Sequence, residues 1–188
     1  MPHPFQSISQ DKFGKVFWPL FAVTIILMIA LNLVGGPTNT ASAPYGIISY
    51  ELAGSVQKSL DILNSWDVYT QASVAFSLGL DFLFMVAYSC TIALGCIWSA
   101  RVLRERGWPF ASLGAPLAWG QWLAAILDAV ENIALLLILF NFMHAGAIGA
   151  PWPQIARWSA IFKFGLVFFG LVYAFFGGAI RLFVKSHD

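Results

Sequence analysis

The stretch that decides the fold covers residues 75–100 and reads AFSLGLDFLFMVAYSCTIALGCIWSA, with Asp81 as its one charged residue. The hydrocarbon core of a bilayer is about 30 Å thick, so a helix that crosses it needs roughly 20 mostly apolar residues. Three further stretches, residues 17–36, 115–143 and 156–184, meet the same requirement. We therefore predict an all-α, polytopic membrane protein in which four transmembrane helices form a bundle, as a single domain over residues 1–188.

The composition of the whole chain agrees with a lipid environment. Of its 188 residues, 59% are hydrophobic and 10% are charged, and the mean hydropathy is +0.76. Soluble domains carry about 25% charged residues, so these charges are too few to cover a surface that faces water. The net charge of +1 and the two cysteines exclude a nucleic-acid-binding protein and a disulfide scaffold. The bilayer is therefore the first predicted partner, and no nucleic acid is expected.

Lysine and arginine are unevenly distributed between the two ends of the predicted helices. Cytoplasmic loops of membrane proteins carry an excess of these residues. The segment before the first helix, the loop between the second and third, and the end of the fourth all fall on one side, which places both termini in the cytoplasm of a cell-membrane protein. These segments hold Lys12, Lys15, Arg101, Arg104, Arg106, Arg181 and Lys185, whereas the opposite side holds Lys58 and Arg157.

The first apolar stretch has an alternative interpretation as a signal peptide. Ala41, Ser42 and Ala43 resemble a cleavage site of small residues. A signal-peptide core is typically about 7–15 residues long, whereas the apolar run from Phe17 to Val34 is longer than that. The length favours a retained transmembrane helix.

Residues 37–74 form the long outer loop, which is predicted to contain a short amphipathic helix. Ser55 is a suitable N-cap residue for it. Val56, Leu60 and Leu63 recur on one helical face, and polar residues occupy another. The aromatic residues of the loop are of the kind that settles in the headgroup layer, and we expect them there: Tyr45, Tyr50, Trp66 and Tyr69.

Four charged residues lie deep inside the predicted spans, away from their ends: Asp81, Asp128, Glu131 and Lys163. Each such charge costs roughly 2.5–3.5 kcal/mol near the bilayer centre if it faces lipid, so we expect all four to face the interior of the bundle. At about 100° per residue, polar side chains of the last three spans align with them. The candidate ligand-binding residues are Asp81, Tyr88, Gln121, Asp128, Glu131, Asn132, Lys163 and Tyr173.

Acids outnumber bases in this set. Asp81 and Lys163 lie at similar depth, so they can be partners. That pairing leaves Asp128 and Glu131 without a cation from within the chain, unless Lys163 reaches inward and serves several acids. Three acids cannot all stay ionised beside one lysine in a medium of low dielectric constant. Either a carboxyl holds a proton, or a positive charge is supplied by a metal ion, a protonated ligand amine or a residue of another subunit.

No resident cofactor is predicted. Asp128 and Glu131 have the spacing of a Glu-x-x-His pair from a di-metal helical bundle, but a histidine is missing. His3 and His187 lie in the tails and His144 lies at the outer end of the third span, so paired haem ligands within the membrane are also missing.

Two resemblances can be named. The segments Tyr50–Ala53 and Leu80–Phe84, with Ile62, Leu63, Trp66, Ala87 and Tyr88, resemble an uncharacterised group of small bacterial four-helix membrane proteins. In overall plan the chain is also similar to the EXPERA group, which includes sterol isomerases and sigma-2-like receptors. That similarity implies intramembrane acids around a lipid-like, often cationic ligand. The isomerases use an intramembrane histidine, which this chain does not have in its predicted helices.

These observations favour a protein that binds or transports a proton, a cation or an amine-bearing lipid-like ligand, and an oligomer is expected because four helices are few for a complete transporter. Two alternatives stay open. One is a membrane enzyme acting on a lipid-like substrate, with Asp128 or Glu131 as proton donor or acceptor and Tyr88 assisting. The other is an accessory subunit whose buried acids pair with a basic residue of a partner in a membrane complex.

Overall fold

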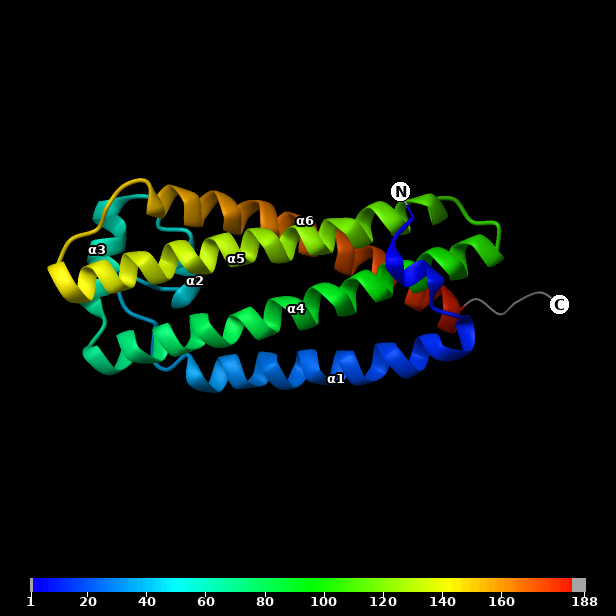
Figure 1. Ribbon diagram of the computed structural model, residues 1–188, viewed down its shortest axis with the longest axis horizontal. Helices are drawn as coiled ribbons and strands as arrows, with labels where there is room; N and C mark the ends of the chain where they lie inside the picture. The colour runs from blue at the N-terminus through cyan, green and yellow to red at the C-terminus, as the bar shows by residue number, and fades with distance from the viewer. Residues whose placement is uncertain (1, 184–188) are drawn as a thin grey trace. The chain divides into compact units, whose positions relative to one another are not determined.

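A computed structural model describes residues 2–183, and every regular element in that range is helical. The predicted end of the last helix at Val184, and Lys185, lie outside the described residues. Figure 1 shows the elements in chain order. They are η1 (Pro4–Ser7), α1 (Gln10–Val34), α2 (Ile47–Glu51), α3 (Val56–Ser65), α4 (Val68–Glu105), η2 (Ala111–Leu113), α5 (Gly114–Ala145) and α6 (Trp152–Phe183).

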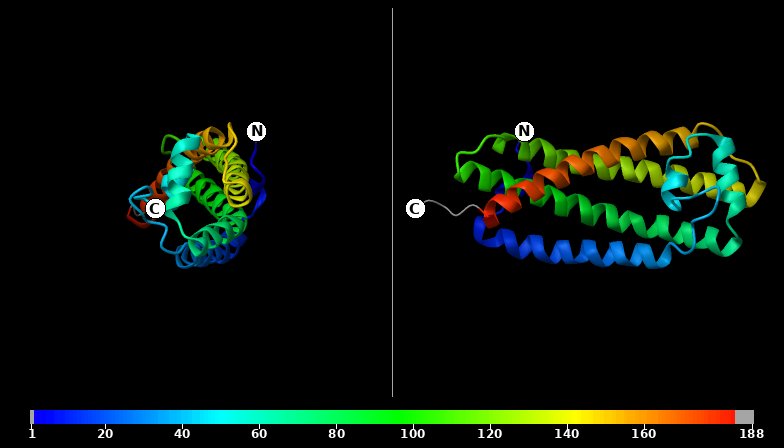
Figure 2. Two further views of the ribbon diagram at one scale, coloured as in Figure 1. Left: turned by 90° about the vertical axis from the view of Figure 1, so that its left-hand side faces the viewer. Right: turned by 180° about the vertical axis from the view of Figure 1, so that it is seen from behind.

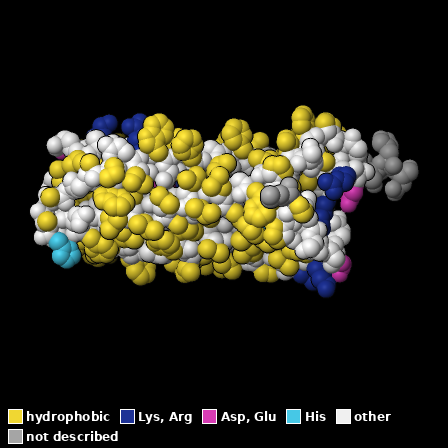
Figure 3. All heavy atoms as spheres, turned by 45° about the horizontal axis from the view of Figure 1, so that its top comes forward, with side chains coloured by type: hydrophobic (Ala, Val, Ile, Leu, Met, Phe, Trp, Pro, Cys, Tyr) yellow, Lys and Arg dark blue, Asp and Glu magenta, His cyan; other side chains and the backbone are white. Residues whose placement is uncertain are grey.

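Four of these helices, α1, α4, α5 and α6, are long and apolar enough to cross a membrane. On the face drawn in Figure 3, hydrophobic side chains predominate and the visible charged groups form a few small patches. The predicted fold class is confirmed, and the chain is a multi-pass membrane protein.

Two helices begin seven residues before the predicted stretches: α1 at Gln10 rather than at residue 17, and α4 at Val68 rather than at residue 75. α1 ends at Val34, two residues before its predicted end. Asp67 explains the early start of α4, because its Oδ1 atom accepts a hydrogen bond of 2.7 Å from the backbone N–H of Thr70 and so satisfies a donor of the first turn. The predicted outer loop therefore contains α2, α3 and the first turns of α4.

The chain divides into two compact units, and each long helix contributes residues to both. The first unit comprises Met1–Thr24, Val86–Ala125 and Phe164–Asp188, and the second comprises Ile25–Met85 and Ile126–Lys163. The prediction of a single domain stays a prediction.

Close helix packing and polar contacts to the backbone hold the first unit together. The Cys96 thiol donates to the carbonyl oxygen of Gly170 at 3.4 Å, and Ser99 Oγ donates to that of Ala174 at 3.0 Å. Arg101 Nη2 donates to the carbonyl oxygen of Ile8 at 2.7 Å, which fixes the segment before α1 against α4. Small residues thus let helices approach closely here, as is usual in membrane proteins.

The core of the second unit forms where the outer loop packs on the long helices. In Figures 1 and 2, α3 (cyan) lies beside the last turns of α5 and the first turns of α6. Ser55 caps α3 by accepting from the backbone N–H of Lys58 at 3.3 Å, so the predicted amphipathic helix is confirmed. Its buried residues are Ser59, Ile62 and Leu63.

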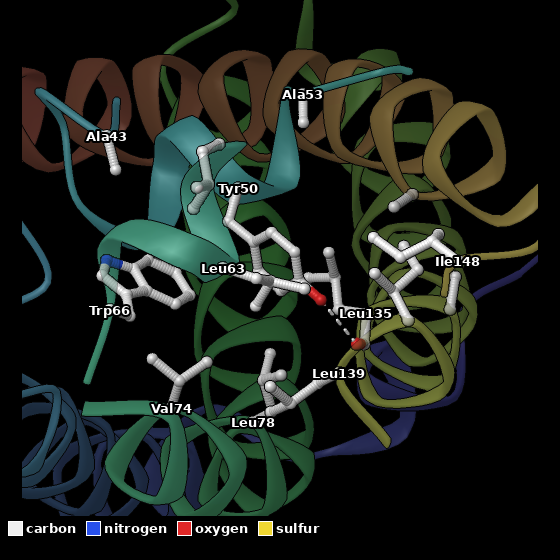
Figure 4. Close-up of a cluster of buried hydrophobic side chains, with 14 residues drawn as sticks. Ala43, Tyr50, Ala53, Leu63, Trp66, Val74, Leu78, Leu135, Leu139 and Ile148 are labelled. Carbon is white, nitrogen blue, oxygen red and sulfur yellow. Dashed lines mark hydrogen bonds between the residues drawn. The ribbon is translucent and has the colours of Figure 1, made fainter. Parts of the chain in front are cut away.

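Two aromatic residues of the loop belong to this core and not to the headgroup layer. Tyr50 is 1% exposed and Trp66 is 4% exposed. The Tyr50 hydroxyl donates to the carbonyl oxygen of Leu135 at 2.9 Å, as Figure 4 shows, and Trp66 Nε1 donates to that of Thr38 at 2.8 Å. The expectation was wrong for these two because each buried polar atom finds a protein acceptor. Tyr45 and Tyr69 are exposed.

Candidate ligand-binding site

The second unit brings together five of the eight predicted site residues. Asp81 comes from α4 and Lys163 from α6. Asp128, Glu131 and Asn132 come from α5, where spacings of three and four residues place them on one helical face. Asp128, Glu131, Asn132 and Lys163 are all buried.

Lys163 forms the ion pairs of this cluster. Its Nζ atom lies 2.8 Å from Oδ1 of Asp128 and 2.7 Å from Oε2 of Glu131. Lys163 also interacts electrostatically with Asp81. Asp81 Oδ2 accepts a hydrogen bond of 2.6 Å from Nδ2 of Asn132. A direct ion pair between Asp81 and Lys163 stays a prediction, whereas the long lysine side chain does serve the two acids of α5.

Glu131 is incompletely paired. Its side chain is fully buried, and its Oε1 atom has no hydrogen-bond partner among residues 2–183. A carboxylate buried without a donor to each oxygen carries a large desolvation cost, because water no longer solvates it. This oxygen therefore needs a proton or a donor from a neighbouring group.

The neighbouring group is Glu51, at the end of α2, which sequence reasoning missed. Its carboxyl lies within hydrogen-bonding reach of the Glu131 carboxyl and interacts electrostatically with Asp81, Asp128 and Lys163. Burial raises the pKa of Glu51 to about 7; the Lys163 ammonium acts against this rise and the Asp128 carboxylate adds to it. One signal was available, since Glu51 is the only charged residue in the segment 37–57.

The local structure of α2 explains why Glu51 reaches the cluster. Gly46 precedes α2 with a positive φ of 58°, and a Cβ atom there would overlap the side chain of Thr38, so only glycine fits this turn. Tyr50 then anchors α2 to the carbonyl oxygen of Leu135. Leu135 lies one helical turn beyond Glu131 on α5. The anchor therefore holds the next residue, Glu51, at the level of Glu131.

A pocket of about 320 Å³ adjoins the cluster within the second unit. Glu51, Asp81 and Asn132 lie in its wall, whereas Glu131 does not. The part of the chain that the structure describes contains no group of three or more His, Cys, Asp or Glu residues able to hold a metal ion. The other residues of the wall are Leu31, Asn32, Gly35, Gly36, Thr38, Asn39, Ile47, Ser77 and Leu78.

The other three predicted site residues, Tyr88, Gln121 and Tyr173, lie in the first unit. Gln121 Nε2 donates to the carbonyl oxygen of Leu166 at 2.9 Å, and the Tyr173 hydroxyl donates to that of Phe110 at 3.0 Å. Tyr88 is buried. The contacts of Gln121 and Tyr173 join helices or loops through the backbone. A ligand-binding role for these three residues stays a prediction.

No family model, curated protein or solved structure matches the chain. The resemblances to a group of small bacterial four-helix proteins and to the EXPERA group stay predictions.

Proposed function

We propose that this membrane protein binds a small amphiphilic amine in the pocket of the second unit, with the ligand's ammonium group between the carboxyls of Glu51 and Asp81. The single observation that carries the proposal is the position of these two acids in the wall of a pocket. Both belong to a cluster in which carboxyls outnumber the one lysine.

The charge balance of the cluster supports a cationic ligand. Four carboxyls, those of Glu51, Asp81, Asp128 and Glu131, interact with the ammonium of Lys163. Lys163 is within ion-pair distance of Asp128 and Glu131, the two acids on the α5 side. Glu51 and Asp81 therefore supply negative charge at the pocket wall, where an entering cation is attracted.

The size and lining of the pocket favour an organic cation over a bare ion. Its volume of about 320 Å³ is at the lower end of the range of small-molecule sites. Leu31, Ile47 and Leu78 contribute apolar side chains to the same wall as the two acids. An ammonium group attached to a short hydrocarbon chain matches both parts of this wall.

The direction of ligand entry follows from the proposed orientation. The distribution of Lys and Arg supports cytoplasmic termini in a cell membrane, which places the loop of residues 37–74 outside. Thr38, Asn39 and Glu51 of this loop lie in the pocket wall, so the ligand enters from the outer side. Release on the cytoplasmic side would make the protein part of a transporter, and we expect such a transporter to be a homo-oligomer.

A matched pair of probes tests the proposal. Hexylamine and hexanol share a hydrocarbon chain and differ in charge, so their binding to the purified protein in detergent is compared by calorimetry. The charged probe should bind and the alcohol should not. The double variant Glu51→Gln, Asp81→Asn should lose at least tenfold in hexylamine affinity.

Asp61→Asn is the matched control, because Asp61 is an exposed acid on α3 outside the pocket wall. It should bind hexylamine like the wild type. Equal binding of hexylamine and hexanol, or unchanged hexylamine affinity in a folded double variant, would contradict the proposal. Circular dichroism and gel filtration establish whether the variant is folded.

A further inference from the structure

The carboxyls of Glu51 and Glu131 face each other in the cluster. Glu131 is fully buried, its Oε2 atom is paired with Lys163, and its Oε1 atom has no hydrogen-bond partner in the range 2–183. Two ionised carboxylates in this position would repel each other, and Oε1 would have no donor. A single proton between the two groups removes both problems.

The position of Glu51 gives the shared proton a route to water. The charged groups that interact with it are Asp81 from α4, Asp128 and Glu131 from α5, and Lys163 from α6. Burial, Asp128 and Asp81 raise the pKa of Glu51 from the ordinary value of 4.5 to about 7, and the Lys163 ammonium and the Glu131 carboxyl act against this rise. Glu51 is also the member of the pair that lies in the pocket wall.

We propose that an entering ammonium ion replaces the proton shared by Glu51 and Glu131, so that this site exchanges one proton for one organic cation. The inference rests on the proposed function of the pocket. The O–H bond of the carboxyl that holds the proton breaks, its electron pair stays on that oxygen, and the proton leaves to water through the pocket. Glu51, now a carboxylate, pairs with the ammonium, so one positive charge replaces another.

Exchange of this kind prevents the cluster from carrying its full negative charge. Without proton or ligand, four carboxylates would face one ammonium in a buried site, which is costly. The net charge of the cluster is the same whether the proton or the cationic ligand is bound. The proton and the cation therefore compete for one position, and the affinity for the cation falls about tenfold for each pH unit below the pKa of Glu51.

The test measures protons released when hexylamine binds. Calorimetric titrations of the purified full chain are run in buffers of different ionisation enthalpy, at pH 6 and at pH 8.5. An alkylammonium group resembles that of lysine, with a pKa near 10.4, so the probe stays charged at both values. We expect about one proton released per hexylamine at pH 6 and close to none at pH 8.5.

Two failures are distinguishable. If hexylamine binds and its affinity depends on Asp81, but no proton is released at pH 6, the exchange is wrong and the binding proposal stands. If hexylamine does not bind at all, both proposals are wrong.

The variant Glu51→Gln tests whether the released proton comes from the pair of Glu51 and Glu131. Glu51→Gln should bind hexylamine more weakly than the wild type, with no proton release and with an affinity that no longer changes between pH 6 and pH 8.5. The control Asp61→Asn should release the proton as the wild type does. Proton release that persists in Glu51→Gln would overturn the assignment to this pair.

Discussion

The ammonium of Lys163 lies 2.7 Å from Oε2 of the fully buried Glu131, while Oε1 of the same carboxylate has no hydrogen-bond partner among the residues described. One lysine thus serves the two acids of α5, and the acid of α2 interacts with one of them, Glu131. In the proposed function, Lys163 balances the charge of the α5 acids, and the ligand binds to the two acids of the pocket wall, Glu51 and Asp81.

Lys163→Met should destabilise the protein strongly. It leaves Asp128 and Glu131 buried without a counter-charge, and removal of one partner from a buried ion pair typically costs about 3–5 kcal/mol. The free energy of unfolding is measured in detergent micelles. Lys58→Met, at an exposed position on α3, is the control and should change it by less than about 0.5 kcal/mol.

The second-site change Glu131→Gln should recover part of the loss in Lys163→Met, since one fewer uncompensated charge is then buried. If Lys163→Met and Lys58→Met had the same free energy of unfolding, the Lys163 ammonium would not stabilise the fold by neutralising buried acids.

Stability should fall as the pH rises through neutrality, and Glu51 should cause part of this fall. The pKa of Glu51 is raised from 4.5 to about 7 in the folded protein, so the folded state binds more protons than the unfolded state between these values. The stabilisation is therefore fully present below about pH 4.5 and is lost as the pH rises through 7. The melting temperature is measured from pH 5 to pH 8.5.

Glu51→Gln isolates this contribution, because the amide does not titrate. Its melting temperature should decline less than that of the wild type over the same range, and Asp61→Asn should follow the wild type. Parallel curves for the wild type and Glu51→Gln would mean that Glu51 is ionised throughout.

Tyr50→Phe should destabilise the second unit by about 1 kcal/mol, the usual net value of a buried hydrogen bond. The change removes the bond from the Tyr50 hydroxyl to the carbonyl oxygen of Leu135 and keeps the ring. Tyr45→Phe is the matched control, because Tyr45 is 75% exposed. Unfolding free energies that are the same for both variants would rule out an anchoring role for Tyr50.

Gly170→Ala should destabilise the first unit by about 1–3 kcal/mol through overpacking. A Cβ atom at this position would overlap the side-chain amide of Gln121 and lie 3.0 Å from Cγ2 of Ile92. Gly165→Ala, on the same helix, has no atom within 4 Å of the added Cβ and should be neutral or slightly stabilising. If the two variants unfold alike, close packing at Gly170 is not required.

The sequence was sufficient for those features that hydropathy and helical periodicity determine. An apolar run with one acid, such as residues 75–100, has few alternatives to a membrane helix. The spacing of Asp128, Glu131 and Asn132 fixes a common face on α5 without any knowledge of the neighbours. The presence of a capped helix after Ser55 follows from the same local rules.

The features that depend on the path of the outer loop could not be predicted. Glu51 joins the cluster because α2 is anchored to α5 through Tyr50, a contact between residues 85 positions apart in the chain. Tyr50 and Trp66 looked like headgroup residues because their partners, Leu135 and Thr38, offer backbone oxygens that no side-chain pattern reveals. Depth along the helices did not decide which acids Lys163 pairs with, since its long side chain reaches Asp128 and Glu131 as well.

A crystallographic anomalous map of the protein with 6-bromohexylamine would show whether the pocket binds an amine. We expect a bromine peak inside the pocket near Leu31, Ile47 and Leu78, with density for the ammonium between Glu51 and Asp81. A bromine peak found only along the outer surfaces of the helices, with the pocket filled by protein side chains, would contradict the proposed function.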